Sequence, residues 1–222
     1  MPFAAVLCDI EGTTTSISFV HEVLFPLSHR HMQEFVEADW DGDDIAALAR
    51  EISPFNKENV VHTLRLWIES DRKHTVLKSI QGKIWRRAFE SGQIHGHVYP
   101  DVPPNFRKWK ASGMRIAIFS SGSAQAQQLL FRYSDAGDLS TYIDAYFDTN
   151  TGPKNDVSSY EQIARSLDLR PTEILFLSDT VAELDAARAS GMQTIQLLRD
   201  GGTAGSHPTA LTFDNIRQTV NP

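Results

Sequence analysis

The sequence predicts an α/β fold, in which a doubly wound parallel sheet is interrupted after its first strand by a block of helices. Unbroken apolar runs are typical of parallel strands buried on both faces, and they occur at residues 3–8, 115–119, 173–177 and 193–197. From residue 100 onward such runs alternate with helical patterns, whereas residues 15–95 contain helical patterns only. A Rossmann-like core with an inserted helical cap accounts for both regions.

The first strand ends at two carboxylates, Asp9 and Glu11, which are followed by Gly12. Residues i and i+2 of an extended chain point to the same side, so both carboxylates are expected to face one spot just beyond the strand. Open α/β sheets bind their ligands at this carboxyl edge. Cys8, the only cysteine, lies inside the apolar run and is expected to be a buried structural thiol.

Apolar residues at helical spacing fill the segment after Thr14. The predicted helices cover residues 17–36, 45–49, 59–70 and 75–89. Pro26 is expected to kink or divide the first of these helices. The core of this block is expected to contain Trp67, Trp85 and Phe89. Because the block directly follows the first strand, it would act as a cap over a ligand bound at the carboxyl edge.

Pro100 to Pro104 mark the return to the core. The later pattern predicts helices at residues 105–111, 124–133, 158–167 and 181–189. It predicts strands at residues 115–119, within 142–147, at 173–177 and at 193–197, and an edge element at 211–213. We therefore expect a core domain made of residues 1–14 and 99–222, and a cap domain made of residues 15–98.

The bulk composition argues against several classes of partner. The chain has 222 residues and a formal net charge of −7, which argues against nucleic-acid binding and provides no basic patch for a membrane surface. The N-terminus lacks the pattern of a signal peptide, and no apolar stretch is long enough to cross a bilayer. We expect a cytoplasmic protein in a reducing compartment.

Polar side chains follow the predicted strands at the edge where parallel strands converge. They are Asp9, Glu11, Ser120, Ser121 and Asp179, and a Gly-Pro-Lys loop adds Lys154. Carboxylates so close together repel one another, and Mg²⁺, which prefers carboxylate, water and phosphate oxygens, would relieve that repulsion. A lysine beside a cation is explained if a dianionic phosphate lies between them. The set predicts a phosphoryl pocket, although either serine is also suited to cap the next helix.

The same set of residues supplies a mechanism. One carboxylate can attack phosphorus in line and form an aspartyl-phosphate, while the metal and Lys154 neutralise the equatorial oxygens. A second carboxyl, two residues along the chain, can protonate the leaving oxygen. It can then deprotonate the water that hydrolyses the acyl-phosphate.

Four segments resemble, in order, the motifs of the haloacid dehalogenase superfamily. Residues 9–13, Asp-Ile-Glu-Gly-Thr, are similar to its first motif, Asp-x-Asp-x-Thr. Ser120 after Ile-Ala-Ile-Phe matches the second motif, and Lys154 matches the third. Asp179, with Glu183 four residues later, matches the fourth. The helical block occupies the usual position of the cap in this superfamily.

Glutamate at the second acidic position is unusual for the superfamily, and further stretches resemble its enolase-phosphatase family, the acireductone synthases of methionine salvage. These stretches are residues 9–20, 24–26, 77–85, 96–104 and 119–123. The family implies a Mg²⁺-dependent conversion of 2,3-diketo-5-methylthiopentyl-1-phosphate to an acireductone and phosphate. The diketone is first enolised, and the phosphate is then removed.

The resemblance also implies a role for each site residue. Asp9 would be the nucleophile and a metal ligand, and Glu11 the general acid/base with its backbone carbonyl on the metal. Asp179 would bind the metal, and Glu183 would orient Lys154 or metal-bound water. The phosphate would be held by Ser120, Ser121 and Lys154. One Mg²⁺ per subunit and a monomer are implied as well.

Three alternatives remain. A generic Mg²⁺-dependent small-molecule phosphatase or phosphomutase of the same superfamily would share this site. A non-catalytic, metabolite-binding regulator would be expected to lack the nucleophile or the metal-binding acid, whereas this chain has Asp9, Lys154 and Asp179. A dehalogenase of the superfamily would need no metal.

Overall fold

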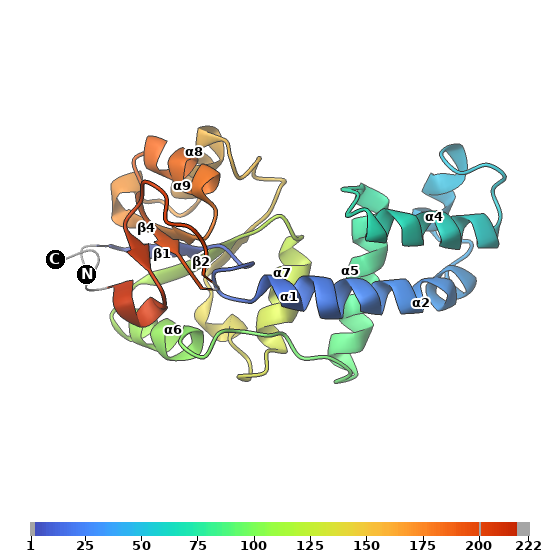
Figure 1. The fold of residues 1–222 in the computed structure, drawn as a ribbon, viewed down its shortest axis with the longest axis horizontal. Coiled ribbons are helices and arrows are strands. Elements are labelled where there is room, and N and C mark those ends of the chain that lie inside the picture. Colours follow the sequence, from blue (N-terminus) through green and yellow to red (C-terminus); the bar gives the residue numbers. More distant parts are fainter. Residues whose placement is uncertain (1–2, 200, 217–222) are drawn as a thin grey trace. The chain divides into compact units, whose positions relative to one another are not determined.

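The computed structural model describes residues 3–199 and 201–216. The predicted core domain also includes residues 1–2, 200 and 217–222, which lie outside the described part. The chain divides into two compact units, residues 1–17 with 95–222 and residues 18–94. Figure 1 labels several of their elements.

The first unit is built on a six-stranded parallel sheet with the order β3-β2-β1-β4-β5-β6. Its strands are β1 (Ala5–Cys8), β2 (Arg115–Phe119), β3 (Ala145–Phe147), β4 (Ile174–Ser178), β5 (Gln193–Leu197) and β6 (Thr209–Ala210). In β1, Ala5 lies between Arg115 of β2 and Ile174 of β4. The predicted doubly wound parallel sheet is therefore confirmed, with β1 near its centre.

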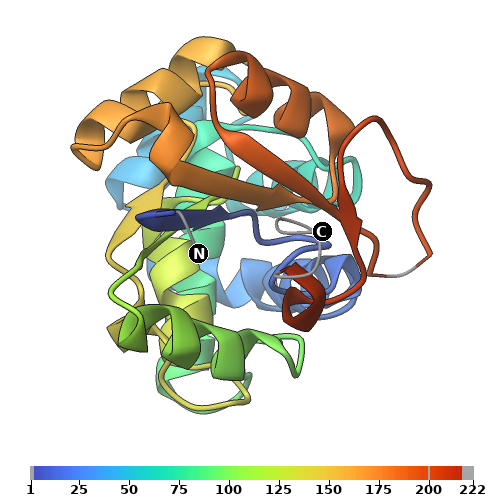
Figure 2. The ribbon, with the colours of Figure 1, turned by 90° about the vertical axis from the view of Figure 1, so that its left-hand side faces the viewer.

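Helices cover both faces of this sheet (Figure 2). α8 (Val157–Ser166) and α9 (Val181–Ala189) lie on one face, and α6 (Val102–Ala111) and α7 (Ala124–Arg132) lie on the other, as right-handed crossovers require. Alternate strand residues point to the same face. One apolar cluster accordingly joins strand residues such as Leu7, Phe119 and Phe176 to Tyr160 of α8 and Leu184 of α9.

Two predicted elements of this unit are misplaced. α6 begins at Val102 rather than at residue 105, because prolines are tolerated in the first turn of a helix, where the backbone N–H groups have no partner within the helix. The edge element predicted at 211–213 is wrong in position. Strand β6 lies at Thr209–Ala210, and Phe213 begins a short 3₁₀ turn.

The second unit, residues 18–94, is described in full, and its regular elements are helices joined by turns, with no strand among them. Its longer helices are α2 (Phe25–Ala38), α3 (Asp43–Ala47), α4 (Lys57–Glu69) and α5 (Thr75–Glu90). A short helix, α1 (Ile17–Phe19), and a π-helical turn at Val20–Leu24 precede α2, whose first turn contains Pro26. The backbone stays helical at Phe19, Leu24 and Phe25, so Pro26 does not divide the helix, and the π-helical turn lies directly before the turn that contains Pro26. Trp67 and Phe89 are buried in this unit, and the half-buried Trp85 donates its indole N–H to the Leu24 carbonyl.

No helix within the described residues combines the length and the apolar content that a membrane-spanning segment needs.

Candidate active site

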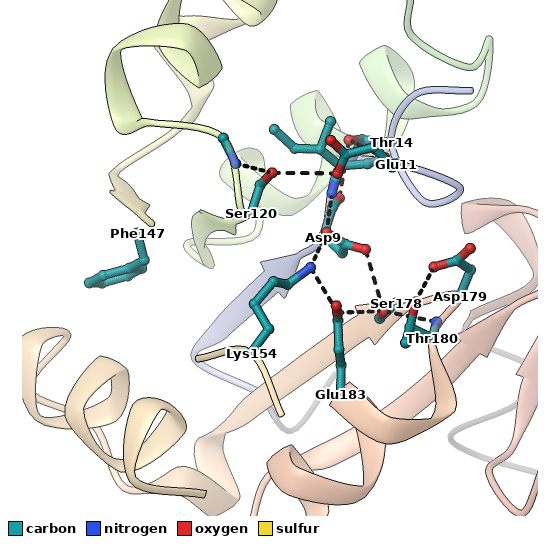
Figure 3. Close-up of polar contacts among 12 residues, drawn as sticks. Asp9, Glu11, Thr14, Ser120, Phe147, Lys154, Ser178, Asp179, Thr180 and Glu183 are labelled. Atoms are coloured by element: carbon teal, nitrogen blue, oxygen red, sulfur yellow. Dashed lines mark hydrogen bonds and ion pairs between the residues drawn. The ribbon is translucent and has the colours of Figure 1, made fainter. Parts of the chain in front are cut away.

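The candidate site lies at the carboxyl ends of β1, β2 and β4, where Asp9, Ser120 and Asp179 follow their strands (Figure 3). β1 has β2 on one side and β4 on the other, so the strand order reverses here. In doubly wound sheets, this reversal opens the crevice in which ligands bind.

Asp9 is at the centre of the site and is 2% exposed. Its backbone N–H donates to the Leu177 carbonyl at 2.9 Å, which extends the pairing of β1 with β4 by one residue. Its Oδ1 accepts the Ile10 N–H at 2.7 Å and the Lys154 ammonium at 2.5 Å. Its Oδ2 accepts the Ser178 hydroxyl at 3.4 Å. The sheet and these donors therefore fix the carboxylate.

Lys154 reaches this carboxylate from the loop before α8. Its ammonium lies 2.5 Å from Asp9 and 2.8 Å from Glu183. Burial disfavours the ammonium, but the two carboxylates outweigh burial and raise the pKa of Lys154. The Tyr160 hydroxyl donates to the Lys154 carbonyl at 2.6 Å and so ties this loop to α8. Lys154 is therefore a fixed positive charge.

Asp179 is held against the loop that follows β1. A Cβ atom on Gly12 would lie 2.3 Å from Oδ2 of Asp179, and Gly12 has a positive φ of 68°. Only glycine allows this close approach without strain. The Thr180 hydroxyl donates to Asp179 Oδ1 at 3.0 Å. Burial, together with the charge of Asp9, raises the pKa of Asp179.

Glu11 and Ser120 form the other side of the site. The Ser120 hydroxyl donates to Glu11 Oε2 at 3.4 Å and accepts the Gly122 N–H at 3.2 Å. Ser120 is 1% exposed. Burial, reinforced by the charge of Asp9, raises the pKa of Glu11 and favours its neutral form. A carboxyl tuned in this way is suited to both accept and donate a proton.

The two serines predicted to bind phosphate differ in exposure. Ser121 is exposed in the turn after β2, whereas Ser120 is buried beside Glu11. Neither serine caps α7, because the capping side chain is that of Ser123, which accepts the Ala126 N–H at 3.2 Å. Asp179 likewise precedes the N-cap of α9, which is Thr180.

Glu183 was expected to orient Lys154 or metal-bound water. In the structure, it contacts two residues that also contact Asp9. Its Oε2 contacts the Lys154 ammonium and accepts the Ser178 hydroxyl at 3.0 Å. Burial, followed by the charge of Asp9, raises the pKa of Glu183 to about 7. Ser178, which the sequence analysis missed, therefore links Asp9 to Glu183. Its position at the end of a buried strand, directly before Asp179, is common to many serines and did not by itself indicate this role.

The charges of this site favour an added cation. Four carboxyl groups share the edge with the Lys154 ammonium, and they belong to Asp9, Glu11, Asp179 and Glu183. Within residues 3–199 and 201–216, no three His, Cys, Asp or Glu side chains already converge as a metal-binding group. Mg²⁺ is commonly held by one or two carboxylates, with water and substrate phosphate as the other ligands. The oxygens of Asp9 and Asp179 fit that requirement.

Comparisons with known proteins agree with this geometry. A family model described as a haloacid dehalogenase-like hydrolase matches residues 3–191. A protein of Sorangium cellulosum (strain So ce56) named Enolase-phosphatase E1 is 48% identical, over 97% of this chain and 98% of the relative. A protein of the same name from Azotobacter vinelandii is 44% identical, over 97% of this chain and 98% of the relative.

Solved structures share the fold. The UTR4 protein of Saccharomyces cerevisiae superposes with a TM-score of 0.82 and is 35% identical, covering 96% of this chain and 99% of that one. A HAD phosphatase from Thermococcus onnurineus has a TM-score of 0.65 at 18% identity, covering 99% of this chain and 98% of that one. At this lower identity, the likeness concerns the fold alone.

Proposed function

The chain belongs to the haloacid dehalogenase-like hydrolase family, and within this family we propose that it is a Mg²⁺-dependent enolase-phosphatase. The proposed substrate is 2,3-diketo-5-methylthiopentyl-1-phosphate, and the products are an acireductone and phosphate. Relatives with the enolase-phosphatase name are 43–48% identical over 94–97% of the chain, which supports this choice over a generic phosphatase.

One observation carries the proposal: the buried Asp9 carboxylate lies 2.5 Å from the Lys154 ammonium and at the same sheet edge as Asp179. A carboxylate in this setting is a nucleophile whose target must carry negative charge, since Lys154 offers positive charge beside it. A phosphate monoester meets that requirement. We propose that Lys154 and Ser120 bind the phosphoryl oxygens, with Ser121 contributing from the exposed part of the turn.

When bound, Mg²⁺ would supply positive charge to the phosphoryl oxygens. Asp9 and Asp179 would hold it with their carboxylates, and Glu11 would add its backbone carbonyl. Glu183 and Ser178 would keep Lys154 and Asp9 in place through the contacts described above.

Enolisation moves a proton from the carbon that bears the phosphoester to the adjacent carbonyl oxygen. We assign this transfer to Glu11, because the ionised form of a carboxyl with a raised pKa is a stronger base than the carboxylate of an exposed glutamate. The Ser120 hydroxyl orients the Glu11 carboxyl.

Dephosphorylation follows at the same site. After enolisation Glu11 is again a carboxylate, and it takes up a proton from solvent. A carboxylate oxygen of Asp9 then bonds to phosphorus while the bond from phosphorus to the phosphoester oxygen breaks, and Glu11 gives its proton to that oxygen. Glu11 then takes a proton from water. The resulting hydroxide attacks phosphorus, which releases phosphate and restores the Asp9 carboxylate, and Glu11 returns its proton to solvent before the next turnover.

The proposal extends to the cellular setting of the enzyme. We propose a monomer that binds one Mg²⁺, as the resemblance to the family implies. The buried free thiol of Cys8 is compatible with the reducing cytoplasm. We also propose that the helical region predicted at residues 15–98 acts as the cap of the enzyme.

The test is turnover of the diketone phosphate with Mg²⁺ and after its removal by EDTA. We expect enediol absorbance and free phosphate with Mg²⁺, and neither product without it. Phosphate release with no enol product would instead indicate a generic phosphatase. Unchanged activity in EDTA would contradict the metal requirement.

A further inference from the structure

The stretch 96–104, which the sequence analysis singled out, contacts the loop that follows Asp9 and Glu11. The Tyr99 N–H donates to the Thr14 carbonyl at 3.0 Å. The Ser16 N–H donates to Nδ1 of His97 at 3.1 Å. These bonds brace residues 13–16 from one side.

Arg199, two residues after the end of β5, reaches the same loop from another part of the first unit. Its Nε and Nη2 donate to the Thr13 carbonyl at 3.1 Å and 2.9 Å. Its Nη1 donates to Asp101 at 2.7 Å. The side chains of Arg199 and Asp101 are only 4% and 9% exposed. The buried ion pair of Arg199 and Asp101 is therefore hydrogen-bonded, through Arg199, to the Thr13 carbonyl, two residues after Glu11.

Aromatic rings fix the orientation of this guanidinium. Its central carbon lies 4.4 Å from the centre of the Tyr99 ring and 4.9 Å from that of Phe213. The Phe213 N–H donates to the other oxygen of Asp101 at 2.6 Å. Only arginine offers a planar fork that can stack on rings while it donates in two directions. The 3₁₀ turn at Phe213 therefore belongs to one cluster of contacting residues, which we call the Arg199 cluster. Its members are Tyr99, Asp101, Arg199 and Phe213.

The positions of the Asp9 and Glu11 carboxyl groups depend on the Arg199 cluster to different degrees. Asp9 is held by the sheet, through the Leu177 carbonyl, and by Lys154. Glu11 lies beyond the sheet, in a turn that closes through bonds from the N–H groups of residues 13–15 to the Ile10 carbonyl. The Thr13 carbonyl on this turn is fixed by Arg199. Loss of Arg199 is therefore expected to loosen the turn that carries Glu11 more than it disturbs Asp9.

We infer that Arg199 is a positioning residue, which holds the Thr13 carbonyl and thereby aligns the Glu11 carboxyl for proton transfer. The inference rests on the proposed function, because it uses the role of Glu11 assigned there. Misplacement of a catalytic group by about 1 Å can lower a rate by about 10²-fold. The loss should affect the proton-transfer steps more than binding of the phosphate.

The test compares Arg199→Ala and Arg199→Lys with the wild-type protein. The substrates are the diketone phosphate and p-nitrophenyl phosphate, whose leaving group departs without protonation. For Arg199→Ala we expect kcat on the diketone phosphate to fall by about 10²-fold, with KM within about twofold. The loss on p-nitrophenyl phosphate should be smaller, because this substrate skips enolisation and needs Glu11 only to activate the water that hydrolyses the aspartyl-phosphate. Arg199→Lys should recover part of kcat, because lysine can still donate to the Thr13 carbonyl.

Arg188→Ala is the matched control. Arg188 pairs with Asp185 at 2.6 Å in a half-exposed surface contact and should keep wild-type kinetics. Wild-type kcat in Arg199→Ala, or an equal loss on both substrates, would overturn the inference. If Arg199→Ala does not fold, the same comparison is made with Arg199→Lys. Failure of the wild-type protein to form the enediol would instead refute the proposed function.

Discussion

Replacement of Glu183 by glutamine is expected to stabilise the metal-free protein above pH 7. Burial and the charge of Asp9 raise the pKa of Glu183 from 4.5 to about 7, and its side chain is only 14% exposed. Between pH 4.5 and about 7, the folded protein therefore holds a proton on Glu183 that the unfolded chain releases. The contribution of Glu183 to the free energy of unfolding falls as pH rises through this range. Each pKa unit corresponds to about 1.4 kcal/mol, so the loss amounts to about 3 kcal/mol.

Glutamine resembles the protonated acid and does not titrate, so the variant avoids this loss. The difference in unfolding free energy between Glu183→Gln and the wild type should grow from near zero below pH 4.5 to about 3 kcal/mol above pH 7. The assay is urea unfolding followed by tryptophan fluorescence, in EDTA, at intervals from pH 4.5 to pH 8. A pH-independent offset would reflect packing of the amide and does not enter the comparison.

Glu173→Gln is the matched control for this prediction. Its side chain is hydrogen-bonded to Arg170, which lowers the pKa of Glu173, so removal of its charge should give no gain as pH rises. A difference between Glu183→Gln and the wild type that stays constant from pH 4.5 to pH 8 would refute the reasoning. So would a difference that shrinks as pH rises.

Three further predictions address the remaining parts of the site. Asp9→Asn should lower kcat for phosphate release by about 10⁴-fold or more, and a variant with near wild-type release would exclude Asp9 as the nucleophile. Gly12→Ala places a Cβ 2.3 Å from Oδ2 of Asp179 at a residue with a positive φ. It should lower the free energy of unfolding in urea by about 1–2 kcal/mol and raise the Mg²⁺ concentration needed for half-maximal activity. An unchanged Mg²⁺ titration would contradict this coupling. Tyr160→Phe removes the hydroxyl that donates to the Lys154 carbonyl and should cost about 1 kcal/mol and raise KM, whereas unchanged stability and KM would show that this bond does not position the lysine.

Local patterns in the sequence were sufficient for the sheet and for the residues at its edge. β2 and β5 begin and end at the predicted residues, because an unbroken apolar run ends where polar residues begin. The topology of a parallel sheet then brings Asp9 and Asp179 to one edge. Helix boundaries were less predictable where prolines occupy a first turn, as at Pro103 in α6.

Residues that act through distant partners could not be predicted in this way. Ser178 bonds to Asp9, 169 residues away, and Arg199 bonds to Thr13, 186 residues away. Neither has a local spacing that indicates a partner, since a serine ends many strands and an arginine after a strand is usually exposed. Their roles follow from the fold, which decides which loops meet.

A single-turnover experiment tests the central claim most directly, namely that enolisation and dephosphorylation occur in order at the site around Asp9. Enzyme in excess over the diketone phosphate is mixed with Mg²⁺, and the absorbance of the enol phosphate and the release of phosphate are followed together. We predict that the enol signal rises before phosphate appears, and that Asp9→Asn releases no phosphate on the same time scale. Phosphate release without a preceding enol signal, or at an undiminished rate in Asp9→Asn, would contradict the account.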